Sequence, residues 1–251
     1  MKRTRLGAFV RRVGLGVIGA ALLAPAAGNA QSTPDARLFD AAAVLQALTH
    51  DDETAIPTEL LQRARGIAVI PNVIRGGFIF GARRGRGVVV VRDERGDWST
   101  PAFITLTGGS IGAQIGAEST DLVLVFANDN AVRNLQSGKF TLGGEASAVA
   151  GPLGRNAAMA VTFRAEVYSY VRSRGLFAGA AFQGARLAID DDTNAAYYRA
   201  SGRRAFGPAS PALPTSAQRF LETLAQVAAG PRRPQREAQP PEQEAVTFPL
   251  E

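Results

Sequence analysis

Between residues 65 and 126 the chain consists of short runs rich in β-branched residues, with a glycine at nearly every junction between them. β-Branched residues favour strands, and glycines between strands favour turns and close backbone contacts. The runs predict strands at residues 67–70, 77–82, 87–92, 102–106 and 122–127. Because the connections are short and no regular strand–helix alternation is present, the segment predicts an α+β fold. Its core would be a strongly curved, mainly antiparallel β-sheet or partly closed barrel.

Helical spacing appears on either side of these strands. Ser32-Thr33-Pro34-Asp35 is a typical helix start, and apolar residues at three- and four-residue spacing predict an amphipathic helix over 34–49. A second helix should begin at Pro57 and end at Gly66. Further helices are predicted over 128–136, 193–200 and 217–228, and a hairpin from the runs 161–171 and 176–189. We expect the N-terminal helices to pack on the sheet.

The positive charge of the chain is concentrated at its start. The formal net charge is +6, yet five basic residues and no acidic ones lie in the first twelve positions. After residue 30, 23 basic side chains (28 minus 5) face 22 acidic ones. Without its first thirty residues the chain has almost no net charge, so net charge gives no reason to expect nucleic-acid binding. We therefore expect no nucleic-acid partner.

Residues 1–30 have the layout of a secretory signal: a basic start, an apolar stretch over 13–27 and small residues at 28–30. An uncleaved anchor is the alternative, and the pair Arg11-Arg12 leaves the export route open. The chain contains no cysteine, which excludes a lipobox, disulfides and thiolate chemistry. We expect an exported protein, periplasmic or extracellular and peripherally membrane-associated. Its domain would cover 31–202, and a proline-rich, partly disordered tail would cover 203–251.

The sequence lacks most of the residue combinations that enzymes use for catalysis. His50 is the single histidine, at the end of the first predicted helix, where a capping role is expected. Gly108-Gly109-Ser110-Ile111-Gly112 matches the nucleophile-elbow pattern, but such hydrolases need a histidine after the serine. No dinucleotide-binding or P-loop spacing is present. We therefore expect no enzymatic activity, no catalytic residue and no cofactor.

Acidic residues form two further groups. Glu118 and Asp121 are expected to flank a turn, and they are the best carboxylate candidates if the chain is an enzyme. Asp190-Asp191-Asp192 precedes a predicted helix and suits a cap, with a weak calcium site as the alternative. We assign no metal ligands.

One basic constellation remains. Arg75, Arg83, Arg84 and Arg86 bracket an apolar run that contains Phe78 and Phe80. If 77–82 pairs with 87–92, residues 83–86 occupy the turn and all project from one tip. Guanidinium groups offer forked donors that suit phosphate, and an apolar strand beside them could enter a lipid interface. The alternative is a charged tip that keeps an edge strand soluble.

An ordered series of short motifs spans residues 56–198. It comprises Ile56-Pro57, Ala64-Arg65-Gly66-Ile67-Ala68-Val69-Ile70-Pro71, Gly76-Gly77-Phe78, Gly85-Arg86-Gly87-Val88, Gly96-Asp97-Trp98-Ser99-Thr100-Pro101, Ile115-Gly116, Thr120-Asp121-Leu122-Val123, Gly151-Pro152-Leu153-Gly154-Arg155, Tyr168-Ser169-Tyr170, Ser173-Arg174-Gly175-Leu176-Phe177-Ala178-Gly179, Asn194 and Tyr197-Tyr198. This segment resembles a SYLF domain, a family found in bacterial secreted proteins and in eukaryotic proteins of phosphoinositide membranes and actin patches. The resemblance implies a non-enzymatic domain that binds anionic lipid, assisted by an amphipathic N-terminal segment and basic residues.

The hypothesis that follows is binding of anionic phospholipid at a membrane surface. It would use the first helix and a lipid-binding set of Arg75, Phe78, Phe80, Arg83, Arg84 and Arg86. Phosphatidylglycerol or cardiolipin would be the headgroups, since an exported protein would meet neither phosphoinositides nor actin. The alternatives are an envelope protein that binds protein partners through its proline-rich tail, and an enzyme restricted to carboxylate chemistry.

Overall fold

The computed structural model describes residues 32–48, 55–77, 80–111, 116–138, 140–144, 146–154, 165–173, 176–179, 184–199, 204–209 and 212–230. All of them belong to one compact unit, Ser32–Glu251, which is distinct from Met1–Gln31. The expected signal segment, His50 and the chain after residue 230 lie outside the described residues.

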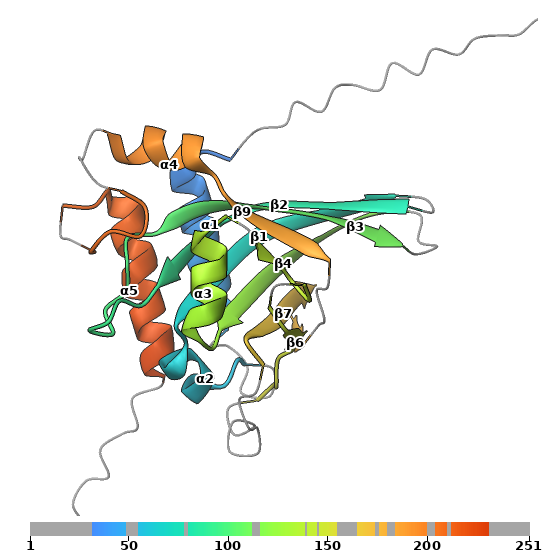
Figure 1. Ribbon diagram of the computed structural model, residues 1–251, viewed down its shortest axis with the longest axis horizontal. Helices are drawn as coiled ribbons and strands as arrows, with labels where there is room; N and C mark the ends of the chain where they lie inside the picture. Colours follow the sequence, from blue (N-terminus) through green and yellow to red (C-terminus); the bar gives the residue numbers. More distant parts are fainter. Residues whose placement is uncertain are drawn as a thin grey trace, which may run out of the picture. The chain divides into compact units, whose positions relative to one another are not determined.

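The described residues form helices and strands in the following order (Figure 1). The helices are α1 (Pro34–Ala47), α2 (Thr58–Arg63), α3 (Asp129–Gln136), α4 (Asp191–Tyr198) and α5 (Thr215–Ala229). The strands are β1 (Gly66–Gly77), β2 (Phe80–Val91), β3 (Ala102–Ile111), β4 (Gly116–Phe126), β5 (Phe140–Thr141), β6 (Ala148–Ala150), β7 (Val167–Ser173), β8 (Leu176–Gly179) and β9 (Ala185–Ile189).

These strands form one sheet in the order β5-β9-β3-β2-β1-β4-β7-β6, with β8 also paired to β7. Of the pairings between described strands, only β6 with β7 is parallel, and the other seven are antiparallel. The sheet is strongly curved, like half of a barrel. The predicted α+β class with a curved, mainly antiparallel sheet is confirmed.

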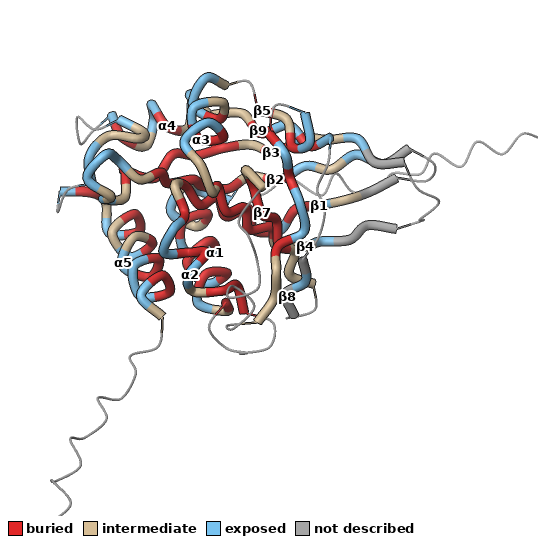
Figure 2. The backbone as a smooth tube through the Cα atoms, turned by 60° about the horizontal axis from the view of Figure 1, so that its bottom comes forward, coloured by how far each residue is buried: buried red, intermediate tan, exposed pale blue. Residues whose placement is uncertain are grey.

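Both faces of the sheet carry a hydrophobic core. On one face, here the α1 face, side chains such as Ile67, Val88 and Phe103 pack with helices α1, α2 and α5. On the opposite face, the α3 face, side chains such as Ile70 and Ile104 pack with helix α3 and with strands β5 and β9. Figure 2 shows the central strands and the inward sides of the helices as buried.

Local capping chemistry explains where the helices begin and end. The Thr33 hydroxyl accepts a hydrogen bond from the Ala36 N–H (3.2 Å), and Pro34 occupies the first turn of α1, as predicted. Asn128 caps α3 by accepting from the Ala131 N–H (2.9 Å), and Gly138 follows its end with φ +74°, also as predicted. The prediction that Gly66 ends the second helix was wrong, because α2 ends earlier and Gly66 begins β1.

Strand lengths differ from the predicted ones. The predicted strands 77–82 and 87–92 were wrong as a hairpin, because residues 80–82 and 87–91 belong to the single strand β2, and Gly77 ends β1. The expected hairpin after residue 161 is confirmed as β7 with β8, whereas β9 leaves it and pairs with β3 and β5. Both faces of strand β7 are covered over residues 167–170. Residues 161–164 lie outside the described part.

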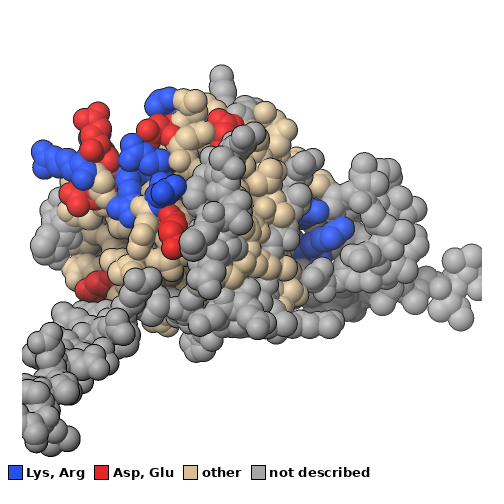
Figure 3. All heavy atoms as spheres, turned by 90° about the horizontal axis from the view of Figure 1, so that it is seen from below, with Lys and Arg blue, Asp and Glu red and all other residues tan. Residues whose placement is uncertain are grey.

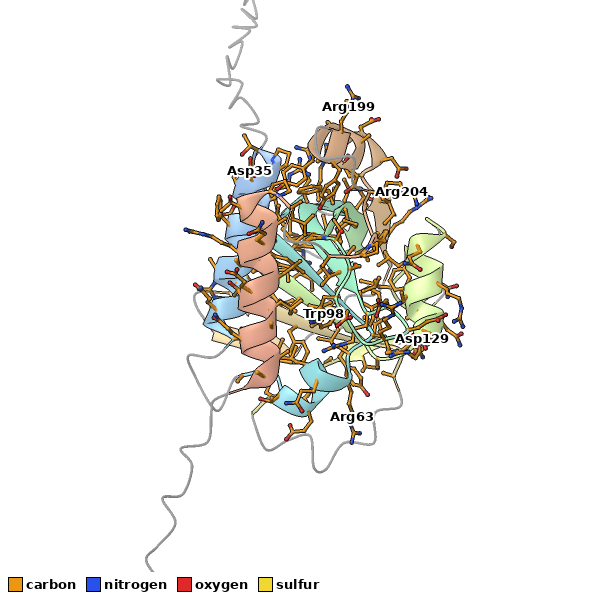
Figure 4. The ribbon with its side chains drawn as sticks, turned by 90° about the vertical axis from the view of Figure 1, so that its left-hand side faces the viewer. Asp35, Arg63, Trp98, Asp129, Arg199 and Arg204 are labelled. Carbon is orange, nitrogen blue, oxygen red and sulfur yellow. The ribbon has the colours of Figure 1, made fainter. Side chains whose placement is uncertain are left out.

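The packed unit extends beyond the expected boundary at residue 202. Helix α5, predicted over 217–228, lies along α1 and buries Phe220 and Leu224 completely. Figure 4 shows the two helices side by side. Residues 212–230 therefore belong to the folded domain rather than to a tail. None of the helices in the described residues is both long and apolar enough to span a membrane.

Candidate anion-binding surface

The sheet has an outer half that the helices do not cover. It consists of strands β1 to β4 beyond residue 73 of β1, together with the neighbouring residues of β9. Ile74 is 58% exposed there, and Arg84, Thr107 and Arg186 are also exposed. In Figure 1, β2 and β3 extend past the helices, and in Figure 2 the colour along them changes from buried to exposed.

A β-bulge in β1 separates the covered half from the outer half. Val69 pairs with Val88 but Ile74 pairs with Arg84, so β1 has one more residue than β2 over this stretch. Within the bulge Asn72 adopts φ +52°, which asparagine tolerates better than most residues, and its N–H donates to the Asp121 carboxylate (3.0 Å). One extra residue shifts every following side chain of β1 to the other face.

The three arginines of the predicted tip lie inside strand β2, and Arg75 lies in β1. Only residues 78–79 separate β1 from β2, so Arg83 to Arg86 lie within β2 and not in a turn. The prediction that they project together from a hairpin tip was therefore wrong. Alternation along the strand places Arg83 on the α3 face, and Arg84 and Arg86 on the α1 face. Phe78 and the side chain of Phe80 lie outside the described part.

Arg75 and Arg83 form a like-charged pair on the α3 face. They are direct partners in the register of β1 with β2, and both are half-buried. Burial, and then the charge of Arg75, lower the pKa of Arg83, although an arginine stays protonated at any physiological pH. Glu118 is the register neighbour of Arg75 on β4. Like charges directly opposite one another destabilise a sheet, so an anion at this pair would be stabilising.

Three arginines gather on the α1 face. Thr107 of β3 pairs with Arg84 on one side and with Arg186 of β9 on the other, so the three side chains share one row. Arg86 pairs with Thr105 one step closer to the helices. We call Arg84, Arg86 and Arg186, with Thr105 and Thr107, the arginine face.

The sequence did not reveal Arg186. It lies between the buried residues Ala185 and Leu187, and that alternation marks it as outward-facing. Its nearness to Arg84 follows from the pairing of β9 with β3, across about eighty residues of chain. No local signal could have placed these two arginines together.

Arg75 and the arginine face differ in their partners from several arginines of the covered half. Arg37 pairs with Asp190 (3.2 Å), Arg65 with Asp129 (2.7 Å) and Arg172 with Asp121 (3.2 Å). By contrast, no described carboxylate forms an ion pair with Arg75 or with the three arginines of the arginine face. Figure 3 shows one basic group set apart from the mixed acidic and basic side chains at the left of the view.

Comparison with known proteins identifies the family. The sequence model described as "Ysc84: Las17-binding protein actin regulator" matches residues 107–237, just over half of the chain. The chain belongs to the Ysc84 family. The SYLF resemblance found in the sequence is thereby confirmed.

Ysc84-family relatives from fungi and animals align over more than half of this chain. LAS seventeen-binding protein 3 of Saccharomyces cerevisiae is 38% identical over 151 residues, which are 58% of this chain and 33% of the relative. The SH3 domain-containing YSC84-like protein 1 of Homo sapiens is 41% identical over 146 residues, 57% of this chain and 42% of the relative. The Xenopus laevis protein of the same name is 41% identical over 154 residues, 60% and 46% respectively. The match thus spans a third to just under half of these relatives, and no solved structure matches.

The remaining candidates of this Ysc84-family chain have structural roles or unsuitable positions. Glu118 and Asp121 were expected to flank a turn, but both lie inside β4, at positions of opposite faces. Asp121 binds Arg172 and the Asn72 N–H, so it holds the bulge. The elbow motif is also misplaced, because residues 108–111 continue strand β3 instead of forming a strand–turn–helix corner.

Asp190 acts as the helix cap that the sequence suggested. Its carboxylate accepts from the Thr193 N–H (3.2 Å) at the start of α4 and pairs with the buried Arg37 of α1. Burial raises the pKa of Asp190, but hydrogen bonds from Thr193 and Arg37 outweigh it, so the pKa is lowered overall. Within the described residues, no three His, Cys, Asp or Glu side chains are grouped to hold a metal ion.

Helix α1 does not present its apolar face to a membrane. Leu38 and Leu45 are fully buried in the core, and only Phe39 among its large apolar residues is exposed, at 45%. Its first turn is tied to the domain, because the Ser216 hydroxyl of α5 donates to Asp35 (2.5 Å; Figure 4). The apolar face of α1 is therefore occupied by the core, and contact between the first helix and lipid stays a prediction.

Proposed function

We propose that this Ysc84-family chain binds anionic phospholipid at a membrane surface and catalyses no reaction. The observation that supports the proposal is the outer half of the sheet, where Arg75, Arg83, Arg84 and Arg186 lie on two faces and Arg86 lies next to them opposite the bulge. Guanidinium forks bind phosphate oxygens in pairs, more specifically than an ammonium group does. The family is described as a Las17-binding actin regulator, and one relative is named LAS seventeen-binding protein 3, so both names refer to binding rather than to a reaction.

The proposal includes the environment of the protein. A secretory leader at residues 1–30 would bring the chain to a bacterial-type envelope, where phosphatidylglycerol and cardiolipin are the anionic headgroups. Because the rest of the chain has nearly balanced charge, 23 basic against 22 acidic residues, attraction would come from the local arginines. Such attraction reaches only about one Debye length, roughly 10 Å at 0.1 M salt.

Co-sedimentation with vesicles tests this function. The chain from Gln31 onward contains the whole compact unit and lacks the apolar leader, which would itself bind lipid. We expect it to sediment with vesicles of phosphatidylcholine and phosphatidylglycerol, and not with phosphatidylcholine alone. Moderate salt should weaken the binding, since each basic residue near the surface contributes about 1 kcal/mol at low salt. Equal binding to both vesicles, or to neither, would contradict the proposal.

A protein-interaction role in the envelope is the second candidate, and the name LAS seventeen-binding protein 3 supports it. A pull-down with the same chain distinguishes the two. Capture of a defined protein partner, without any sedimentation on anionic vesicles, would favour the second function over the first.

A further inference from the structure

We propose that the arginine face is the surface that binds the lipid headgroup, and that Arg186 of β9 is one of its binding residues. This inference rests on the proposed function and makes it specific to one side of the sheet. The arginine face and the pair Arg75 and Arg83 lie on opposite faces, so a single headgroup cannot contact both.

The spacing of the arginine face brings several phosphate ligands together. Neighbouring strands lie about 4.8 Å apart, so Arg84 and Arg186, two strands apart, have Cα atoms roughly 10 Å from each other. Arg84 and Arg86 are two residues apart on one strand, about 7 Å. Long arginine side chains bridge such distances, and their guanidinium groups can converge on one phosphate or bind two adjacent ones.

The threonines between the arginines add neutral donors. Thr107 is exposed and lies directly between Arg84 and Arg186, while Thr105 is half-buried beside Arg86. A threonine hydroxyl both donates and accepts hydrogen bonds, so it can contact phosphate or the glycerol of a headgroup. Ile74, which is 58% exposed and pairs with Arg84, supplies an apolar side chain at the edge of the same row.

The shape of the surface favours a membrane over a soluble anion. The row Arg84, Thr107 and Arg186 is exposed along its length on one open face of the sheet. A small soluble anion would be bound from one side only and would remain largely hydrated, whereas a bilayer presents a continuous layer of phosphates that can contact all three side chains. An exposed apolar residue beside the arginines also suits a lipid interface.

The nearest acidic residues do not neutralise this surface. Asp121 lies on the α1 face but is paired with Arg172, and Asp190 is paired with Arg37. Asp191 and Asp192 are exposed, but they follow Ile189 at the opposite end of β9 from Arg186. The arginine face therefore keeps its positive charge at the outer end of the sheet.

Single substitutions test the assignment. We expect Arg186→Ala and Arg84→Ala each to weaken partition onto phosphatidylcholine–phosphatidylglycerol vesicles about fivefold, the effect of one basic residue at an anionic surface. Arg219→Ala is the matched control, because Arg219 is an exposed arginine of α5, distant in the fold from the outer sheet. Arg186→Lys should restore only part of the binding, since lysine keeps the charge but not the fork. All four variants should keep the wild-type unfolding midpoint.

The outcomes separate this inference from the function on which it rests. If the unsubstituted chain ignores anionic vesicles, the proposed function fails. If it binds them and Arg186→Ala behaves like Arg219→Ala, the function stands and the arginine face is refuted. Loss of binding in Arg75→Ala and Arg83→Ala alone would then assign the headgroup to the α3 face.

Discussion

Gly87 is a position where a single methyl group should strongly disturb the sheet. A Cβ atom added there would lie 2.2 Å from the Val69 carbonyl oxygen and 2.7 Å from the Ile70 Cα atom. Both are backbone atoms at the start of the β1 bulge, and a flexible side chain cannot relieve the overlap. Gly87→Ala must therefore move one strand relative to the other.

The size of the effect follows from this contact. Overpacking a core costs about 1–3 kcal/mol, and the rigid backbone neighbour places Gly87→Ala at the upper end, about 3 kcal/mol. For a domain of this size, 1 kcal/mol corresponds to roughly 2–4 °C in Tm, so we expect a decrease of about 6–12 °C. Alanine's smaller backbone entropy in the unfolded chain offsets less than about 1 kcal/mol of this.

Gly109→Ala is the matched control for thermal and urea unfolding. Gly109 lies in β3, and an added Cβ atom would meet nothing within 4 Å. Its stability should change little or rise by up to about 1 kcal/mol. Equal effects of the two substitutions, or a Gly87→Ala variant as stable as wild type, would refute the close contact between the bulge and β2.

Three further substitutions test the rest of the fold. Asn194→Ala should lower the free energy of unfolding in urea by about 1–3 kcal/mol. The Asn194 side-chain amide accepts a hydrogen bond from the N–H of buried Phe103 (2.8 Å) and donates one to its carbonyl (3.0 Å). An unchanged free energy of unfolding would contradict this role. Phe220→Ala should cost about 3–5 kcal/mol, and an unchanged Tm would mean that α5 is not part of the core. Asp190→Asn should destabilise the chain at pH 7, because the folded pKa of Asp190 lies below its unfolded value. The ionised carboxylate stabilises the fold above the unfolded pKa of about 4, so the difference in free energy of unfolding between wild type and Asp190→Asn should shrink as pH falls below that value. A difference that stays constant with pH would exclude the interaction of the carboxylate with Arg37.

Local chemistry was enough to predict several of the helix caps, although not the end of α2. The Thr33 and Asn128 caps, Gly138 and the Asp190 cap each depend on a few neighbouring residues, so their sequence signals translate directly into structure. The fold class could also be predicted from the sequence, because dense β-branched runs with short connections favour a curved antiparallel sheet.

Strand register could not be predicted from the sequence, because it depends on contacts between distant segments. Gly85 was expected in a turn and Gly87 at the start of a strand, yet both lie inside β2 and let the β1 bulge pack closely on it. Arg186 joins Arg84 through pairing of β9 with β3, which no local pattern records. Helix α5 was separated from the domain by a proline-rich spacer, and its burial depends on α1, far away in sequence.

The bulge decides which charges share a face. Without its extra residue, alternation from Val69 would place Arg75 on the α1 face with Arg84, and Ile74 on the α3 face. The bulge exchanges them, so Arg75 faces Arg83 across the strands and Ile74 joins the arginine face. Since Gly87 admits the bulge and Asp121 binds its Asn72 N–H, these residues position the arginines without contacting a ligand. A change at Gly87 should therefore alter both faces at once, whereas a change at Arg186 alters only one.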